Sequence, residues 1–193
     1  MDEITGKPRS NESLKRILPD ELHRVALHEA GHALLRMLNE SSGEKLAYIS
    51  IVPRNNGRLG FVASLPSSSV SHTKKTYLEI LEVLLGGRAA EEVILGSENV
   101  SSGAGGDENS DLGKATRLAE SMVTRYGFGK NAGLVYADLP NPDQEKEAGE
   151  LINDCYRAAL SKLYENKERL QKIIDILIKR QEISGNDLRE LLK

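Results

Sequence analysis

The stretch "ELHRVALHEAGHALLRMLNE", residues 21–40, combines two patterns that few backbone conformations satisfy together. Its apolar residues recur every three to four positions on more than one face, which predicts a well-covered helix over about residues 20–39. His28 and His32 lie inside that apolar stretch, four residues apart, and Glu29 follows the first of them. Residues i and i+4 of a helix project from the same side, so the two imidazoles can reach one common ligand.

The remainder of the chain is dominated by helical periodicity. Aromatic residues make up only 4% of the 193 positions, so the core must be aliphatic, as in packed helices. Residues 45–66 alternate instead, which predicts two strands around a turn at Asn55-Asn56-Gly57. The further helices are expected over about 73–95, 111–126, 143–165 and 167–181, followed by a short one that Ser184 caps.

These elements predict a mainly α fold with a small β-hairpin or sheet near the histidine-bearing helix and a C-terminal helical bundle. A length of 193 residues suits one large domain. We assign that domain to residues 20–193, with the metal-binding core over about 20–127 and the helical C-terminal part over about 143–193. Residues 1–19 are interpreted as a polar lead-in or linker remnant.

Two local features refine the first helices. Asp20 follows a proline and is expected to cap the first helix. Gly86 and Gly87 interrupt the middle of the predicted 73–95 helix, where each costs roughly 1 kcal/mol relative to Ala. Such glycines suggest close packing against another backbone, and we expect that partner to be the first helix at Gly31.

Composition excludes several classes of protein. The net charge is −3 and the pI is about 5.9, so a basic surface for nucleic acid is not expected. Cys155 is the single cysteine, which rules out a disulfide within the chain and a cysteine-based zinc site, and it is expected to be a buried hydrophobic residue. No apolar run reaches about 18 residues, so the sequence predicts a soluble chain without a membrane span.

The spacing of the two histidines is that of a zinc site. Each can give one ring nitrogen to a single Zn²⁺, which prefers nitrogen, sulfur and carboxylate ligands. Glu29 is rotated by about 100° from His28, too far to be a comfortable third ligand, yet it can reach water at the metal. Glu29 is therefore predicted to be the general base of a metallopeptidase, in which zinc and base together hydrolyse a peptide bond.

A catalytic zinc site needs a third protein ligand. A third histidine at the usual spacing is absent, because Leu38 stands there, and His23 and His72 are expected to be ordinary surface residues. A carboxylate remains, and Asp111 is well placed because it opens a helix, whose positive end favours an ionised group. The candidates from spacing alone are Glu79, Glu82, Glu91, Glu92, Asp107 and Asp111.

Four blocks in order resemble the peptidase domain of the FtsH family: "RVALHEAGHALL", "IVPRNNGRLGF", "LLGGRAAEEVILG" and "SSGAGGDENSDLGKATRLAESMVTRYG". The resemblance runs from about Leu22 to the C-terminus. It implies that the ligands of Zn²⁺ are His28, His32 and the Asp of a "DLxxAT" block, which is Asp111 here. "GGDENS" lengthens the preceding loop relative to many members, so Asp107 stays the alternative.

The family consists of membrane-anchored, ATP-dependent proteases that work as hexameric rings with an AAA+ ATPase. The resemblance therefore implies unfolded polypeptides as substrates, a homo-hexamer, and a full-length protein anchored in a membrane with this domain on the cytoplasmic side or its organelle equivalent. No phosphate-binding loop of the ATPase type occurs in this sequence, so we expect an excised C-terminal domain or a stand-alone relative.

Two functional questions stay open at this level. The strand over about 58–65 could bind substrate as an additional strand, with Leu59, Gly60 and Phe61 nearest the zinc, or the sheet could only cover the first helix. The alternative to an active peptidase is a non-catalytic module that assembles a ring.

Overall fold

The computed structural model describes residues 18–39, 43–54, 59–66 and 71–193. It is mainly α with one small antiparallel sheet, so the predicted fold class is confirmed. The predicted turn at Asn55-Asn56-Gly57 and nearly all of the predicted lead-in lie outside the described residues. Among the residues that are described, a helix with the length and hydrophobicity needed to traverse a bilayer is not found.

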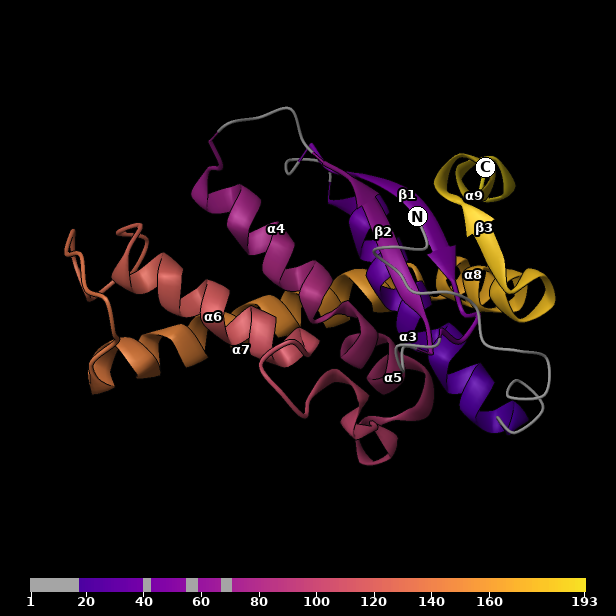
Figure 1. The fold of residues 1–193 in the computed structure, drawn as a ribbon, viewed down its shortest axis with the longest axis horizontal. Coiled ribbons are helices and arrows are strands. Elements are labelled where there is room, and N and C mark those ends of the chain that lie inside the picture. The colour runs from indigo at the N-terminus through magenta and orange to yellow at the C-terminus, as the bar shows by residue number, and fades with distance from the viewer. Residues whose placement is uncertain (1–17, 40–42, 55–58, 67–70) are drawn as a thin grey trace.

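The histidine-bearing helix, α3 (Pro19–Leu38), runs from the lower right of the molecule to behind the small sheet in Figure 1. The expectation that Asp20 caps it is wrong: the helix begins at Pro19, with Leu18 in extended conformation before it. Proline suits the first helical position, because its missing N–H would have no partner there. Residues 26–35 of α3 are almost all buried, which matches the predicted cover on more than one side.

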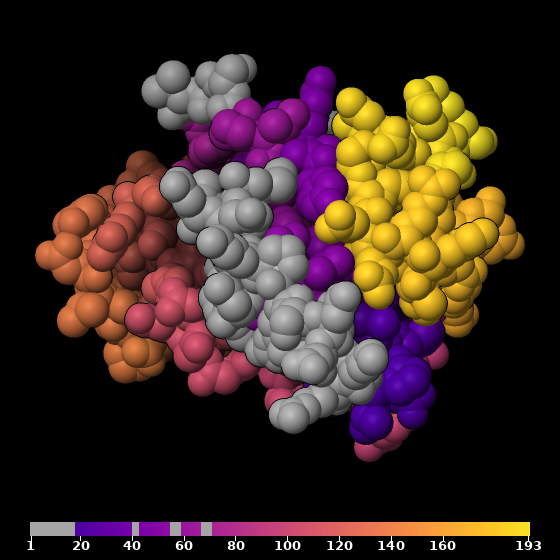
Figure 2. Space-filling model, turned by 45° about the vertical axis from the view of Figure 1, so that its right-hand side comes forward, coloured from indigo at the N-terminus to yellow at the C-terminus, as the bar shows by residue number. Residues whose placement is uncertain are grey.

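The sheet contains a strand that the sequence did not predict. β1 (Lys45–Ser50) pairs antiparallel with β2 (Phe61–Leu65) as expected, and its other edge pairs with β3 (Glu182–Ser184), giving the order β2-β1-β3. Three residues are too few for an alternating pattern, so β3 leaves no periodic signal. Figure 2 shows the C-terminal segment in yellow packed beside the purple segment that contains β1.

The helix predicted over 73–95 is two helices, α4 (Lys74–Leu84) and α5 (Gly86–Leu95). Thr73 caps the first by accepting a hydrogen bond from the N–H of Thr76, and Gly96 ends the second with a positive φ of 83°. The break falls at Leu85, directly before the glycine pair, and both glycines are helical as the first two residues of α5.

The remaining helices follow the prediction closely. They are α6 (Asp111–Thr124), α7 (Pro142–Glu165), α8 (Lys167–Arg180) and the short α9 (Gly185–Leu191). Ser184 caps α9 by accepting a hydrogen bond from the N–H of Asp187, as expected. Two short 3-10 turns, Ser97–Asn99 and Ser102–Ala104, lie between α5 and α6.

The C-terminal helices complete the core around α3. α8 packs against α3 through Leu170, Ile173 and Ile174, which are fully buried in the same apolar cluster as Leu34. α7 crosses α4, α5 and α6, and its Cys155 is 4% exposed in a second apolar cluster. Burial raises the pKa of the Cys155 thiol to about 12, so the prediction of a buried hydrophobic residue rather than a reactive thiol is confirmed.

Candidate metal centre

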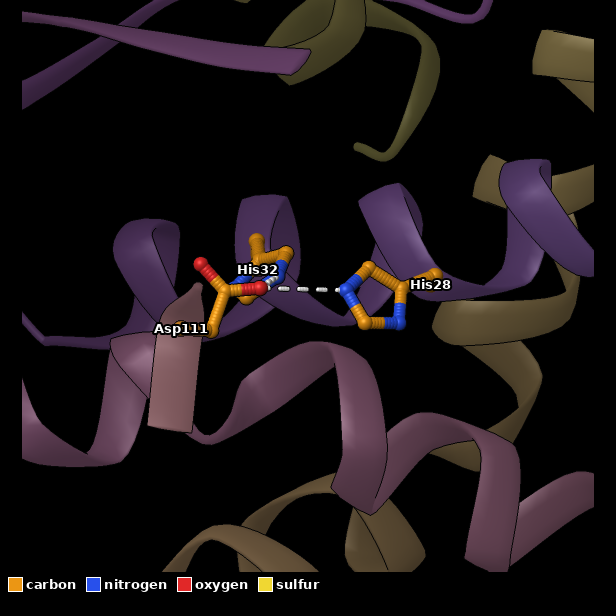
Figure 3. Close-up of side chains that lie close together, drawn as sticks. All are labelled: His28, His32 and Asp111. Carbon is orange, nitrogen blue, oxygen red and sulfur yellow. Dashed lines mark hydrogen bonds and ion pairs between the residues drawn. The ribbon is translucent and has the colours of Figure 1, made fainter. Parts of the chain in front are cut away.

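His28 and His32 project from neighbouring turns of α3 toward the first residue of α6 (Figure 3). The Nε2 atoms of His28 and His32 lie 3.2 Å and 3.1 Å from the same oxygen, Oδ2 of Asp111. The three ligand atoms all lie within 4.8 Å of one another. Zinc bonds of 2.0–2.1 Å in a tetrahedron place ligand atoms about 3.3 Å apart, and the two separations between Nε2 and Oδ2 agree with that value.

The other ring nitrogen of each imidazole, Nδ1, has a hydrogen-bond partner of its own. His32 Nδ1 donates to the carbonyl oxygen of Val83 at 2.7 Å, and His28 Nδ1 lies 3.0 Å from Oε1 of Glu91. A proton on Nδ1 leaves the lone pair on Nε2, which is the tautomer that a metal requires. Both rings are therefore oriented with their ligand nitrogens toward Asp111.

Glu91 is the member of this network whose place the sequence did not reveal. It is 1% exposed on α5 and receives hydrogen bonds from Ser101 N at 2.7 Å, from Ser101 Oγ at 3.0 Å and from Arg24 at 3.2 Å. The sequence marked it only as one of several possible third ligands. In the structure it supports His28 from the Nδ1 side, away from the nitrogens that converge on Asp111.

The electrostatics of the centre favour a cation. Burial raises the pKa of Asp111, but hydrogen bonds from His28 and His32 outweigh it and hold the pKa well below the ordinary value. Burial also opposes ionisation of Glu91, yet its bonds to His28 and Ser101 lower the pKa to about 2. Burial would lower the pKa of His28, but its hydrogen bonds to Asp111 and Glu91 raise it to about 10.

The other candidate ligands have different partners. Asp107 accepts backbone N–H bonds from Asn109 and Ser110 at 2.8 and 2.9 Å, so its carboxylate organises the turn before α6. Glu82 binds Lys162, and Glu92 accepts from the Tyr156 hydroxyl. Within the described ranges, the one group of metal-ligating side chains that converges is His28, His32 and Asp111, and neither His23 nor His72 belongs to it.

Glycines let α5 approach α3 closely behind the histidines. A Cβ at Gly31 would lie 2.2 Å from the carbonyl oxygen of Gly86, and one at Gly87 would lie 2.3 Å from Nε2 of His28. The expected packing of the glycine pair against Gly31 is confirmed for Gly86. Gly87 has a second role, because any side chain there would occupy the space of an imidazole that faces Asp111.

Gly31→Ala is expected to lower the free energy of unfolding by about 1–3 kcal/mol, because the added methyl group overlaps the backbone of α5. Urea unfolding followed by circular dichroism measures the change. Gly149→Ala is the matched control, since Gly149 lies in α7 and a Cβ there meets nothing within 4 Å. That variant should be stabilised by roughly 0.5–1 kcal/mol. Equal stability of the two variants would contradict the close packing.

A cavity of about 970 Å³ opens over the histidine pair. Glu29 lines it and is buried, 9% exposed, on the flank of α3. Leu59, Gly60 and Phe61 line it as well, so all three predicted substrate-binding residues face this cavity. A Cβ at Gly60 would come within 2.8 Å of Glu29, so the chain that enters β2 passes directly over that carboxylate.

Comparison with known proteins identifies the family of this chain. The model of "Peptidase family M41" matches residues 15–144. The chain belongs to peptidase family M41. This M41 chain is 34% identical to the ATP-dependent zinc metalloprotease FtsH 3 of Petrotoga mobilis, over 98% of the chain but 31% of the relative. It is 30% identical to the ATP-dependent zinc metalloprotease FtsH of Thermotoga maritima, over 98% of the chain and 33% of the relative.

The resemblance to FtsH proteins is thereby confirmed, and the similar proteins include one that is named as mitochondrial. The ATP-dependent zinc metalloprotease FTSH 8, mitochondrial, of Oryza sativa is 30% identical over 98% of this M41 chain and 24% of the relative. The chain thus spans about a third or less of the length of these relatives. The residues that the family model matches, 15–144, include both histidines and Asp111.

Proposed function

We propose that this chain is a zinc-dependent endopeptidase domain in which His28, His32 and Asp111 hold Zn²⁺ and Glu29 is the general base. The observation that carries the proposal is the convergence of two Nε2 atoms on one Asp111 oxygen, at 3.2 and 3.1 Å, inside a peptidase family. The relatives' names, all of them zinc metalloproteases, support zinc as the metal. A bound Zn²⁺ supplies Lewis acidity, which makes water nucleophilic at neutral pH and polarises the scissile carbonyl.

Residues of this chain transfer the proton and orient the metal ligands. Glu29 follows His28 on α3 and lines the same cavity, so its carboxylate can take a proton from the attacking water and deliver it to the leaving amine. Glu91 and the Val83 carbonyl keep the two imidazoles in one tautomer and orientation. Gly87 leaves the space that the His28 ring needs.

The substrate is proposed to be an extended polypeptide lying along β2. Within the part of the chain that the structure describes, β2 is an edge of the sheet, since the strand order is β2-β1-β3. Phe61, Val62 and Ser64 of this strand line the cavity that contains Glu29. Main-chain hydrogen bonds to an edge strand are independent of sequence, which suits unfolded proteins as substrates.

The whole protein is proposed to be a longer, ATP-dependent protease of which this chain is the proteolytic part. The relatives are named ATP-dependent and the chain spans only 31% and 33% of two of them. On this proposal an AAA+ segment elsewhere in the protein delivers substrate, the domains assemble as a homo-hexamer, and a membrane anchor holds the ring.

The test is metal removal and restoration. The purified chain should contain about one zinc per molecule and cleave casein or a quenched fluorescent peptide of unfolded sequence. Treatment with 1,10-phenanthroline followed by dialysis should abolish cleavage, and stoichiometric Zn²⁺ should restore it. A zinc-loaded chain that cuts neither substrate, alone or assembled, would instead favour a non-catalytic assembly module.

A further inference from the structure

Three cationic side chains line the cavity over the histidine pair, and two of them are bound closely to carboxylates. Arg24 donates to Glu91 at 3.2 Å, and Arg36 lies 2.9 Å from Glu44. Lys114 differs from both. Its ammonium is 3.9 Å from Oδ1 of Asp111, beyond hydrogen-bond distance, and its side chain is 47% exposed. Lys114 is therefore the most available of the three positive charges.

The position of Lys114 is set by α6. It follows Asp111 by three residues, so both side chains lie on the same side of the first turn. Asp111 directs Oδ2 toward the histidines and Oδ1 toward Lys114. The ammonium thus lies beside the metal centre, on the outer side of the carboxylate that completes it.

The cavity that Lys114 lines is also lined by β2. Phe61, Val62 and Ser64 line it from the sheet, and Lys114 lines it from α6. Side chains of an extended peptide point alternately to opposite sides. A peptide that lies along β2 therefore presents some of its side chains, close to the bond over Glu29, to the cavity that Lys114 also lines.

Among the described residues that line the cavity, five are acidic, and two of these have close partners of their own. Glu91 is bound by Arg24 and Ser101, and Asp107 accepts two backbone N–H bonds. A substrate carboxylate that approaches Lys114 can form a charge-assisted hydrogen bond of about 2.7–2.9 Å, shorter than the present 3.9 Å pair. The four-carbon stem of lysine gives the ammonium the reach to do so.

We propose that Lys114 is a specificity-determining residue that favours peptides carrying Asp or Glu within a few residues of the cleaved bond. This inference rests on the proposed peptidase function and names a class of substrate for it. An exposed ion pair contributes little binding free energy, so kcat/KM is expected to be about two- to fivefold higher for an acidic peptide than for its neutral counterpart.

Cleavage of a matched peptide series tests the preference. The peptides differ at one position at a time, within three residues on either side of the cut bond, where Glu, Gln or Lys is placed. Wild type should show a kcat/KM about two- to fivefold higher for Glu than for Gln at one or more positions. Lys114→Met should equalise Glu and Gln, Lys114→Glu should shift the preference to Lys, and high salt should reduce the effect. Lys172→Met, on an exposed face of α8, should retain the wild-type preference.

A binding measurement keeps this inference separate from the peptidase proposal. Fluorescent forms of the same peptides are titrated with Glu29→Gln and with Glu29→Gln/Lys114→Met, and anisotropy gives the Kd. Tighter binding of the Glu peptides that disappears without Lys114 supports the inference even if wild type cuts no peptide, an outcome that would count against the peptidase proposal alone. Equal Kd and kcat/KM for Glu and Gln peptides in the presence of Lys114 would overturn the inference.

Discussion

Glu29→Gln is expected to lower kcat by a factor of about 10² to 10⁴ while zinc content stays at one per chain. Glutamine keeps the shape of the side chain but has no carboxylate to accept a proton. Glu29 is 9% exposed and lines the cavity beside the histidines, whereas it is not in the group that converges as metal ligands. The change should therefore remove the base without removing the metal.

Steady-state cleavage of a quenched peptide gives kcat, and elemental analysis of the dialysed protein gives the zinc content. Glu21→Gln is the matched control, because Glu21 lies on the same helix and lines the same cavity but is exposed. It should keep kcat within about twofold of wild type, as surface substitutions away from the chemistry do. A Glu29→Gln variant that retains wild-type kcat would refute the assignment of Glu29 as base.

Asp111→Ala is expected to weaken zinc binding by at least about a hundredfold. Mutation of a residue that hydrogen-bonds to a metal ligand already lowers metal affinity 10- to 100-fold, and mutation of the ligand itself should lower it further. The structure motivates the prediction because one oxygen of Asp111 faces both Nε2 atoms. Competition with a chromogenic chelator measures the affinity without relying on activity.

Asp107→Ala separates the two aspartates that the sequence left open. Asp107 accepts the N–H groups of Asn109 and Ser110, so its removal should destabilise the turn before α6 by about 1 kcal/mol and leave zinc affinity nearly unchanged. Asp111→Ala with full zinc, together with Asp107→Ala without zinc, would reverse the assignment. If both variants kept full zinc, a ligand of another kind would be required, and the glutamates of α4 and α5 would become the next to test.

The sequence indicated Glu91 as a candidate residue but could not predict its position next to His28. Glu91 was a candidate only because it is a glutamate on a predicted helix. Its bond to His28 depends on how α5 crosses α3, and its ionised state depends on Ser101 in the following loop. Neither contact has a local sequence signature, because a buried Glu and an exposed Glu look the same in a helical sequence pattern.

Two expectations about element boundaries were wrong for a similar reason. Asp20 has the chemistry of a cap, but Pro19 already fits the first helical turn. The helix over 73–95 has a continuous apolar pattern, but it divides at Leu85, and α5 begins at Gly86 against α3. In both places the local pattern permits more than one boundary, and the surrounding chain selects one.

The sequence by itself determined the fold class, the helix that carries His28, Glu29 and His32, and the family, because periodicity and motif spacing are local properties of the chain. The tertiary structure decided which carboxylate meets the histidines: His32 and Asp111 are 79 residues apart, yet their ligand atoms lie 3.1 Å apart. It also decided that β3 completes the sheet, with Tyr48 opposite Ser184. Such long-range contacts depend on how whole helices and strands pack. The free energy that favours this packing comes from the whole buried core, so no local sequence pattern predicts which residues come into contact.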